Sequence, residues 1–132
     1  MNVLLVDTSV WIDFFRGKTF PELELALKEG RVILSPIVLA ELMSGARNKN
    51  EEKQLRDFLL ELPLHATPEE HWIQVGRLRH AVAKQGFEMS IPDAHVAQCT
   101  RDLEGYLLTK DQIFHKIADI AAIRLLSVTI SE

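Results

Sequence analysis

Near its N-terminus the chain carries the stretch VLLVDTSVWID, residues 3–13, in which an apolar run ends at an aspartate followed by two hydroxyl residues. The run 3–6 is short, branched and apolar, which predicts a buried β-strand. Apolar residues at helical spacing then predict a short helix over 10–15. Acidic side chains are almost never buried unpaired, so Asp7 at the end of a core strand must meet water, a cation or a proton.

Short apolar runs and helical patterns alternate along the rest of the chain. The apolar runs predict further strands at 32–34, 64–66, 106–108 and 124–128. The helical patterns predict helices at 22–28, 36–45, 51–62, 68–85, 91–101 and 113–121. Strands that alternate with helices form parallel sheets covered on both faces. The sequence therefore predicts one α/β domain over residues 1–132 with a central parallel sheet.

Bulk composition bounds the class of protein. Apolar residues make up 47% and charged residues 26% of the chain, as in an ordinary globular domain. No apolar run approaches the roughly 20 residues that span a bilayer, and the net charge of −4 does not favour nucleic-acid binding through bulk charge. Cys99 is the single cysteine, which excludes an internal disulfide and a cysteine-rich zinc site and makes a reducing cytoplasm the expected location.

Four carboxylates stand where apolar segments end. Asp7 and Asp111 directly follow expected strands, Asp93 falls in the first turn of the helix at 91–101, and Glu41 lies within the helix at 36–45. Ligands of open α/β sheets bind outside the carboxyl ends of the strands, so we expect all four acids at that edge. Their mutual repulsion there predicts a hard divalent cation, which prefers carboxylate oxygens.

Each acid also has a purely structural interpretation. Asp7 and Asp93 can stabilise the starts of helices, and Asp111 can be an ordinary turn residue. Glu41 is harder to explain in this way, because it shares a helix face with apolar residues and is expected to be partly buried. The neighbouring hydroxyls are candidates to orient metal-bound water or a phosphate oxygen; they belong to Thr8, Ser9 and Thr109.

Four blocks of the sequence stand out: VDTSVWID at 6–13, PIVLAEL at 36–42, IPDAHVA at 91–97 and LTKD at 108–111. Together they resemble the PIN-domain family, and in particular the VapC-type toxins of toxin–antitoxin pairs. The resemblance covers nearly the whole chain and implies a three-layer α/β/α, Rossmann-like fold. It also implies a Mg²⁺- or Mn²⁺-dependent endoribonuclease whose catalytic and metal-binding residues are Asp7, Glu41, Asp93 and Asp111, supported by Thr8, Ser9 and Thr109.

The same resemblance implies partners for the chain. Such toxins are usually homodimers, and a small VapB-like antitoxin holds them inactive. We expect an antitoxin to dock on an apolar groove formed by Trp11, Phe14 and Phe15 with Leu39 and Met43. Many relatives carry another acid two residues beyond the last aspartate, where this chain has Ile113. We therefore expect one ion in the resting protein and a second ion with substrate.

An RNA substrate requires cations near the acids. Arg16 and Lys18 follow the first expected helix and Lys110 adjoins Asp111, so these three are the predicted phosphate contacts. Asp13 is expected to face solvent from the polar side of the first helix.

Two further patterns concern histidines and the longest expected helix. The five histidines show no pair at metal-ligand spacing. In the helix at 68–85 the expected buried stripe is Trp72, Val75, Leu78 and Val82.

Other α/β domains of this size fit less well. A phospho-accepting receiver domain carries paired acids after its first strand, and a haloacid-dehalogenase-like phosphatase carries an aspartate two residues beyond the first one. Here Thr8 and Ser9 occupy those positions. A catalytically idle PIN-like domain that serves as a binding or assembly module remains the alternative. Its usual signature is the loss of site acids, and this chain has all four.

Overall fold

The computed structural model describes residues 2–127, which form seven helices around a small parallel sheet. The strands are β1 (Leu4–Val6), β2 (Tyr106–Leu108) and β3 (Arg124–Leu126). The helices are α1 (Thr8–Phe15), α2 (Pro21–Lys28), α3 (Pro36–Ser44), α4 (Lys49–Leu59), α5 (Glu69–Lys84), α6 (Ile91–Asp102) and α7 (Gln112–Ala121). The predicted succession of strands and helices is therefore confirmed in its order.

The sheet is parallel throughout, with the strand order β1-β2-β3. Two isolated parallel bridges continue it beyond β1, from Leu4 to Val32 and from Leu34 to Leu64. The strands expected at 32–34 and 64–66 are thus reduced to single bridges. Ser35 already caps α3, so the chain leaves the sheet after Leu34. The expected end of the last strand, residue 128, lies outside the described residues.

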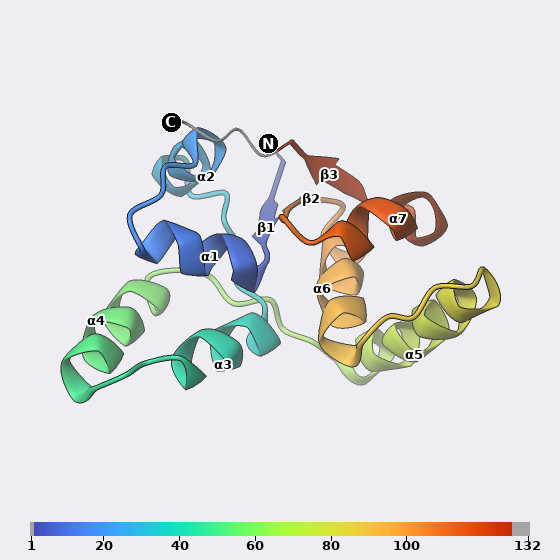
Figure 1. Cartoon of the computed structure of the whole chain (residues 1–132), viewed down its shortest axis with the longest axis horizontal. Coiled ribbons are helices and arrows are strands. Elements are labelled where there is room, and N and C mark those ends of the chain that lie inside the picture. Colours follow the sequence, from blue (N-terminus) through green and yellow to red (C-terminus); the bar gives the residue numbers. More distant parts are fainter. Residues whose placement is uncertain (1, 128–132) are drawn as a thin grey trace.

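Helices cover both faces of the sheet. Figure 1 shows α1 to α4 on one side of the strands and α5 to α7 on the other. The strand residues form the centre of the core: Leu4, Leu5, Leu107 and Leu108 are at most 1% exposed. Parallel strands buried on both faces are expected to be continuously apolar, and these are. The predicted three-layer α/β/α fold is confirmed.

The approach between β1 and the start of β2 is unusually close. Gly105 precedes β2, and a Cβ atom there would lie 2.6 Å from the carbonyl oxygen of Val3. The amide of Tyr106 donates to that same oxygen over 2.9 Å. A side chain at position 105 would therefore push the two central strands apart.

Side chains that cap helices fix where the chain turns at the carboxyl edge of the sheet. Asp7 accepts a hydrogen bond from the amide of Thr8, so α1 begins two residues earlier than predicted. Ser35 and Ser90 cap α3 and α6 through the amides of Val38 and Asp93, each over 3.1 Å. Asp111 caps α7. These caps place the starts of four helices next to the strand ends.

The buried stripe of α5 differs from the predicted one. It consists of His71, Val75, Leu78 and Val82, whereas Trp72 is 38% exposed. The prediction for Trp72 is wrong because α5 instead buries the preceding residue, His71, whose imidazole contacts His95 and Asp102. Within residues 2–127 no helix has the length and apolar character needed to cross a membrane.

Candidate active site

Asp7 is the buried centre of the candidate site, with 8% of its surface exposed. Its carboxylate accepts three hydrogen bonds: from the Thr8 amide (2.9 Å), the Ser9 hydroxyl (3.1 Å) and the Thr109 hydroxyl (2.8 Å). Burial raises the pKa of Asp7 above its usual value, although these three hydrogen bonds act in the opposite direction. The chain therefore holds this carboxylate firmly but leaves its charge only partly compensated.

Glu41 reaches the same place from α3. The hydroxyl of Thr8 donates to its Oε1 atom over 2.9 Å, so Thr8 contacts two of the four acids, Asp7 through its amide and Glu41 through its hydroxyl. Glu41 is exposed, and the expectation that it is partly buried is wrong. The reason is that α3 buries Val38 and Leu42 on one side, which leaves Glu41 at the border of that face.

Asp93 and Asp111 complete the group. Burial raises the pKa of Asp93, and the charge of Asp111 raises it further, with smaller contributions from Asp7 and Glu41. Thr109 connects the two strand ends, because its Oγ1 donates to Asp7 and accepts from the amide of Asp111 over 3.0 Å. The structure thus brings the four sequence-predicted acids into one electrostatic environment, with Thr8, Ser9 and Thr109 between them.

The acids lack cationic partners. Among the described residues, none of the four carboxylates forms an ion pair with lysine or arginine. Within residues 2–127, no three of these carboxylates bring their oxygen atoms within 4.8 Å of one another. The group of side chains in this range that meets the distance is His65, His71 and Cys99. An open acidic group of this kind suits a hydrated ion that takes only one or two direct carboxylates.

The basic residues beside the acids are arranged differently from the prediction. Asp13 is 7% exposed, so its expected exposure to solvent is wrong. It forms ion pairs with Lys110 and, over 3.6 Å, with Lys18. The hydrogen bond from Lys110 lowers the pKa of Asp13. Two of the three predicted phosphate contacts therefore already have an acidic partner within the chain.

A cavity of about 610 Å³ opens next to Glu41. It lies between α1, α3 and α4. Its lining is mainly apolar, with Phe15, Leu42 and Phe58 among its residues, and includes the two arginines Arg16 and Arg47 as well as the acids Glu41 and Glu51. Of the groove predicted for a partner, Phe15 lines this cavity, whereas Trp11 is buried and 1% exposed. The cavity joins the third predicted phosphate contact, Arg16, to the acidic site.

Sequence reasoning missed a second polar cluster. His65, His71, His95, Cys99 and Asp102 come together around α6, although the spacing of the histidines gave no such indication. Two signals were available in the sequence. His95, Cys99 and Asp102 recur at intervals of four and three residues on one face of a helix, and His71 stands in register with the buried stripe of α5.

Comparison with known proteins places the fold. The PIN domain family matches residues 4–120. An uncharacterized PIN and TRAM-domain containing protein from Synechocystis sp., slr1972, is 26% identical over 137 residues, which cover 94% of this chain and 33% of that protein. The chain thus spans about a third of the length of this curated relative.

Solved structures of similar shape cover nearly the whole chain. FitAcB from Neisseria gonorrhoeae has a TM-score of 0.71 and 18% identity, over 95% of this chain and 97% of that one. DNA-bound VapBC from Salmonella typhimurium has a TM-score of 0.76 and 21% identity, over 96% of this chain and 98% of that one. VapBC-5 from Mycobacterium tuberculosis, a member of the VapBC family of toxin–antitoxin systems, has a TM-score of 0.72 and 22% identity, over 97% of this chain and 100% of that one. The fold and the family match agree with the resemblance in the four sequence blocks, and the chain belongs to the PIN domain family.

Proposed function

We propose that the protein is a Mg²⁺- or Mn²⁺-dependent endoribonuclease and the toxin of a toxin–antitoxin pair. The observation that carries this proposal is the group of four coupled carboxylates without a cationic partner at the carboxyl edge of a PIN domain. Uncompensated negative charge in a partly buried site is stabilised by a divalent cation. PIN domains are generally nucleases, which use such ions for phosphodiester hydrolysis.

The donor set fits a hard divalent ion. Asp7 and Asp93 are the more buried pair and are the proposed direct ligands, while the exposed Glu41 and Asp111 act from the solvent side. All four offer carboxylate oxygens, which Mg²⁺ and Mn²⁺ prefer over nitrogen and sulfur. With Ile113 in place of a further acid, we propose one ion in the resting protein and a second with substrate.

The chain's own residues supply position and charge for hydrolysis. A bound divalent ion stabilises developing charge on phosphate and water oxygens. Thr109 and Ser9 keep the Asp7 carboxylate in a single orientation, and Thr8 does the same for Glu41. A carboxylate that is already oriented needs no rearrangement when charge develops, which is the main source of electrostatic catalysis.

The RNA path is proposed to run along the cavity beside Glu41. Arg16 supplies positive charge there, and Phe15 supplies an exposed aromatic face for a base. Arg47 also lines the cavity, but it is paired with Glu51 over 3.4 Å. Lys18 and Lys110 remain proposed phosphate contacts, but their ion pairs with Asp13 reduce the charge that they offer to RNA.

An antitoxin is the proposed protein partner. Two structures whose fold this chain shares are described as a toxin–antitoxin complex, from Klebsiella pneumoniae, and as a member of the VapBC family of toxin–antitoxin systems, from Mycobacterium tuberculosis. The mixed apolar and charged cavity between α1, α3 and α4 offers a site from which a partner would block access to Glu41. A homodimer is also proposed, with Trp72 and Ile73 as exposed apolar side chains on α5 that are available to a second copy.

The nuclease proposal is tested with purified protein and an RNA substrate with added Mg²⁺ or Mn²⁺. We expect metal-dependent cleavage that falls at least about 100-fold in Asp7→Asn and in Asp93→Asn. Asp119→Asn makes the same chemical change at an exposed position of α7 and should leave cleavage unchanged. Equal behaviour of wild type and Asp7→Asn would favour the idle binding module instead.

A further inference from the structure

A second cluster of metal-ligating side chains lies at the opposite end of α6 from the acidic site. Asp93 stands in the first turn of α6 and Asp102 is its last residue, about 14 Å away along the helix axis. Around Asp102 gather His65, from the segment after the Leu34–Leu64 bridge, His71 from the first turn of α5, and Cys99 from α6. Three separate segments of the chain therefore contribute to one place.

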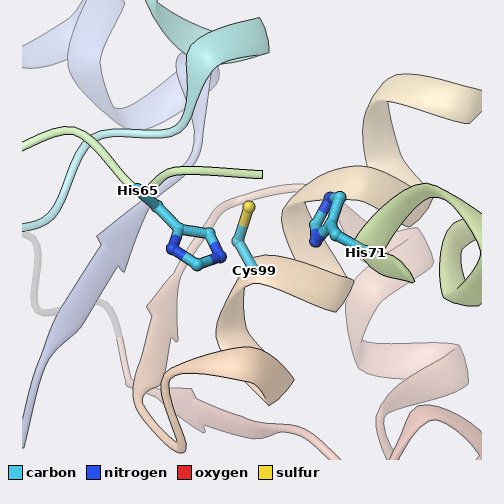
Figure 2. A group of neighbouring side chains, drawn as sticks. All are labelled: His65, His71 and Cys99. Atoms are coloured by element: carbon cyan, nitrogen blue, oxygen red, sulfur yellow. The ribbon is translucent and has the colours of Figure 1, made fainter. Parts of the chain in front are cut away.

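The donor atoms of these side chains converge. One nitrogen each from His65 and His71 and the sulfur of Cys99 all lie within 4.8 Å of one another, and Figure 2 shows the three side chains grouped between α5, α6 and the segment that precedes α5. Asp102 supplies a fourth donor, because its Oδ2 lies 3.0 Å from Nε2 of His65 and 2.5 Å from Nδ1 of His71. Three donors thus converge on one point, and the carboxylate of Asp102 contacts the two histidines among them.

We propose that His65, His71, Cys99 and Asp102 form a site for a borderline transition metal of the Zn²⁺ type, separate from the acidic centre. Two imidazoles, one thiolate and one carboxylate are a tetrahedral zinc donor set. Nitrogen and sulfur donors select such ions, whereas the four acids offer only oxygen and select Mg²⁺ or Mn²⁺. The two sites would therefore hold different metals in the same cellular environment.

Neighbouring side chains already orient the donors. His71 faces Asp102 with Nδ1, and its Nε2 lies 2.8 Å from Nδ1 of His95, so the ring is held by its second nitrogen, as is usual for a metal-bound histidine. Gln98 donates to Oδ1 of Asp102 over 2.8 Å, which leaves Oδ2 directed at the histidines. His95 in turn lies 2.9 Å from the hydroxyl of Ser35.

Burial distinguishes this cluster from chance surface histidines. The side chains of His71 and His65 are 1% and 14% exposed, and Cys99 is fully buried. The hydrogen-bond contacts of the thiol are with the ring of His95, at 3.5 Å and 4.0 Å from sulfur to nitrogen. Asp102 is more accessible, with 24% of its side chain exposed. Buried donors from three separate segments favour a structural metal over a catalytic one.

The expected consequence is mechanical. An ion there would join the start of α5, the segment before it and the end of α6, and α6 carries Asp93 at its other end. Because metal affinity for a preformed site adds to folding free energy, the ion would stabilise the packing of α5 on α6.

The test uses Co²⁺ as a spectroscopic substitute for Zn²⁺ in the full-length protein, kept reduced and freed of metal beforehand. We expect one equivalent of Co²⁺ to give a thiolate-to-cobalt charge-transfer band and the intense visible bands of tetrahedral cobalt, both removed by one equivalent of Zn²⁺. Cys99→Ser should abolish the charge-transfer band and weaken affinity at least about 100-fold. His65→Gln, at the more exposed of the two histidines, should weaken affinity similarly and serves if Cys99→Ser does not fold.

Two controls separate this site from the acidic one. Asp93→Asn, which disables the proposed nuclease centre, should leave the cobalt spectrum unchanged, and so should His115→Gln at an exposed histidine. The proposal is overturned if folded wild-type protein gives no charge-transfer band, since the cluster would then be a hydrogen-bonded network alone. It is equally overturned if Cys99→Ser keeps the spectrum or if Asp93→Asn loses it.

Discussion

Asp7 both caps α1 and carries charge into the interior, and the two roles have opposite effects on stability. Its Oδ1 atom satisfies the Thr8 amide at the helix start, which stabilises the fold. Burial raises its pKa, because the ionised form is less stable in the folded chain without metal than in the unfolded chain. Conserving the cap while removing the charge separates these effects.

Asp7→Asn is therefore expected to stabilise the metal-free protein at neutral pH. Asparagine still accepts from the Thr8 amide, and the hydroxyls of Ser9 and Thr109 can rotate to accept from its NH₂ group. Urea unfolding without added divalent metal measures the change. Asp7→Ala loses the cap as well as the charge and is the matched comparison. If asparagine and alanine destabilise the protein equally, the charge of Asp7 does not lower the free energy of unfolding.

Arg16 is the residue at which RNA contact is best tested. Its side chain lines the cavity beside Glu41, whereas Lys110 is paired with Asp13. We expect Arg16→Ala to weaken RNA binding and to reduce the slope of log affinity against log salt by about 1. Binding is measured with Asp93→Asn as background, to prevent cleavage. Lys110→Ala should change the slope less, and a larger effect of Lys110 would place the phosphate path on the other side of Asp7.

At the scale of single residues, the sequence predicted which carboxylates lie at the site better than it predicted which distant residues contact one another. An acid at the end of an apolar run has to meet polar partners, which is why Asp7, Asp93 and Asp111 could be placed at one edge. The ion pair between Asp13 and Lys110 joins residues 97 positions apart, so nothing local indicates it. The same is true of His65 and Asp102, which meet only after α5 has packed on α6.

At the scale of elements, α4 contacts α1 through aromatic side chains. Phe58 lies 5.4 Å from Phe15 and 5.8 Å from Trp11 between ring centroids, both in edge-to-face geometry. Only Leu59 of this helix is fully buried. Few buried contacts imply a low free energy of local opening, so α4 is the element expected to move most easily over the cavity.

Phe58→Ala tests how α4 is attached. Removing the half-buried ring should cost about 1–2 kcal/mol, below the value for a fully buried phenylalanine. Amide hydrogen exchange should rise in α4 and at the end of α1, while protection in α5 and α6 stays unchanged. Leu60→Ala, at an exposed neighbour, is the control. An equal rise in exchange throughout the chain would show that α4 unfolds only with the whole domain.

The order of elements was predictable because hydrophobic period and capping residues are local signals. The helices predicted to begin at residues 36 and 91 do begin there, and the structure shows Ser35 and Ser90 as their caps. The predicted strands at 32–34 and 64–66 shrank to single bridges, because sheet pairing depends on the partner strand and on where the next helix pulls the chain away. Neither the partner strand nor the position of the next helix can be predicted from apolar composition alone.

At the scale of the whole molecule, two sets of acids oppose each other as pH changes. Asp7 and Asp93 have raised pKa values, chiefly through burial. Hydrogen bonds from Lys110 lower the pKa of Asp13, and those from His65, His71 and Gln98 outweigh burial to lower that of Asp102. A raised carboxyl pKa makes stability fall as pH rises above its unfolded value, whereas a lowered one makes stability fall as pH drops through the folded value.

Added Mg²⁺ should reverse the contribution that Asp7 and Asp93 make to the pH dependence of stability, and leave that of Asp13 and Asp102 unchanged. Without the ion, ionisation of Asp7 and Asp93 above the unfolded value of 3.8 costs stability. With it, ionised carboxylates are the binding form, and stabilisation grows with the ratio of free ion to dissociation constant. The difference in free energy of unfolding with and without Mg²⁺ should therefore increase from about pH 4 to pH 7, as measured by urea titration at each pH. In Asp7→Asn/Asp93→Asn the difference should be small and flat, because Asp13 and Asp102 contribute equally to both conditions. A pH-dependent difference that persists in the double variant would place the ion elsewhere on the molecule.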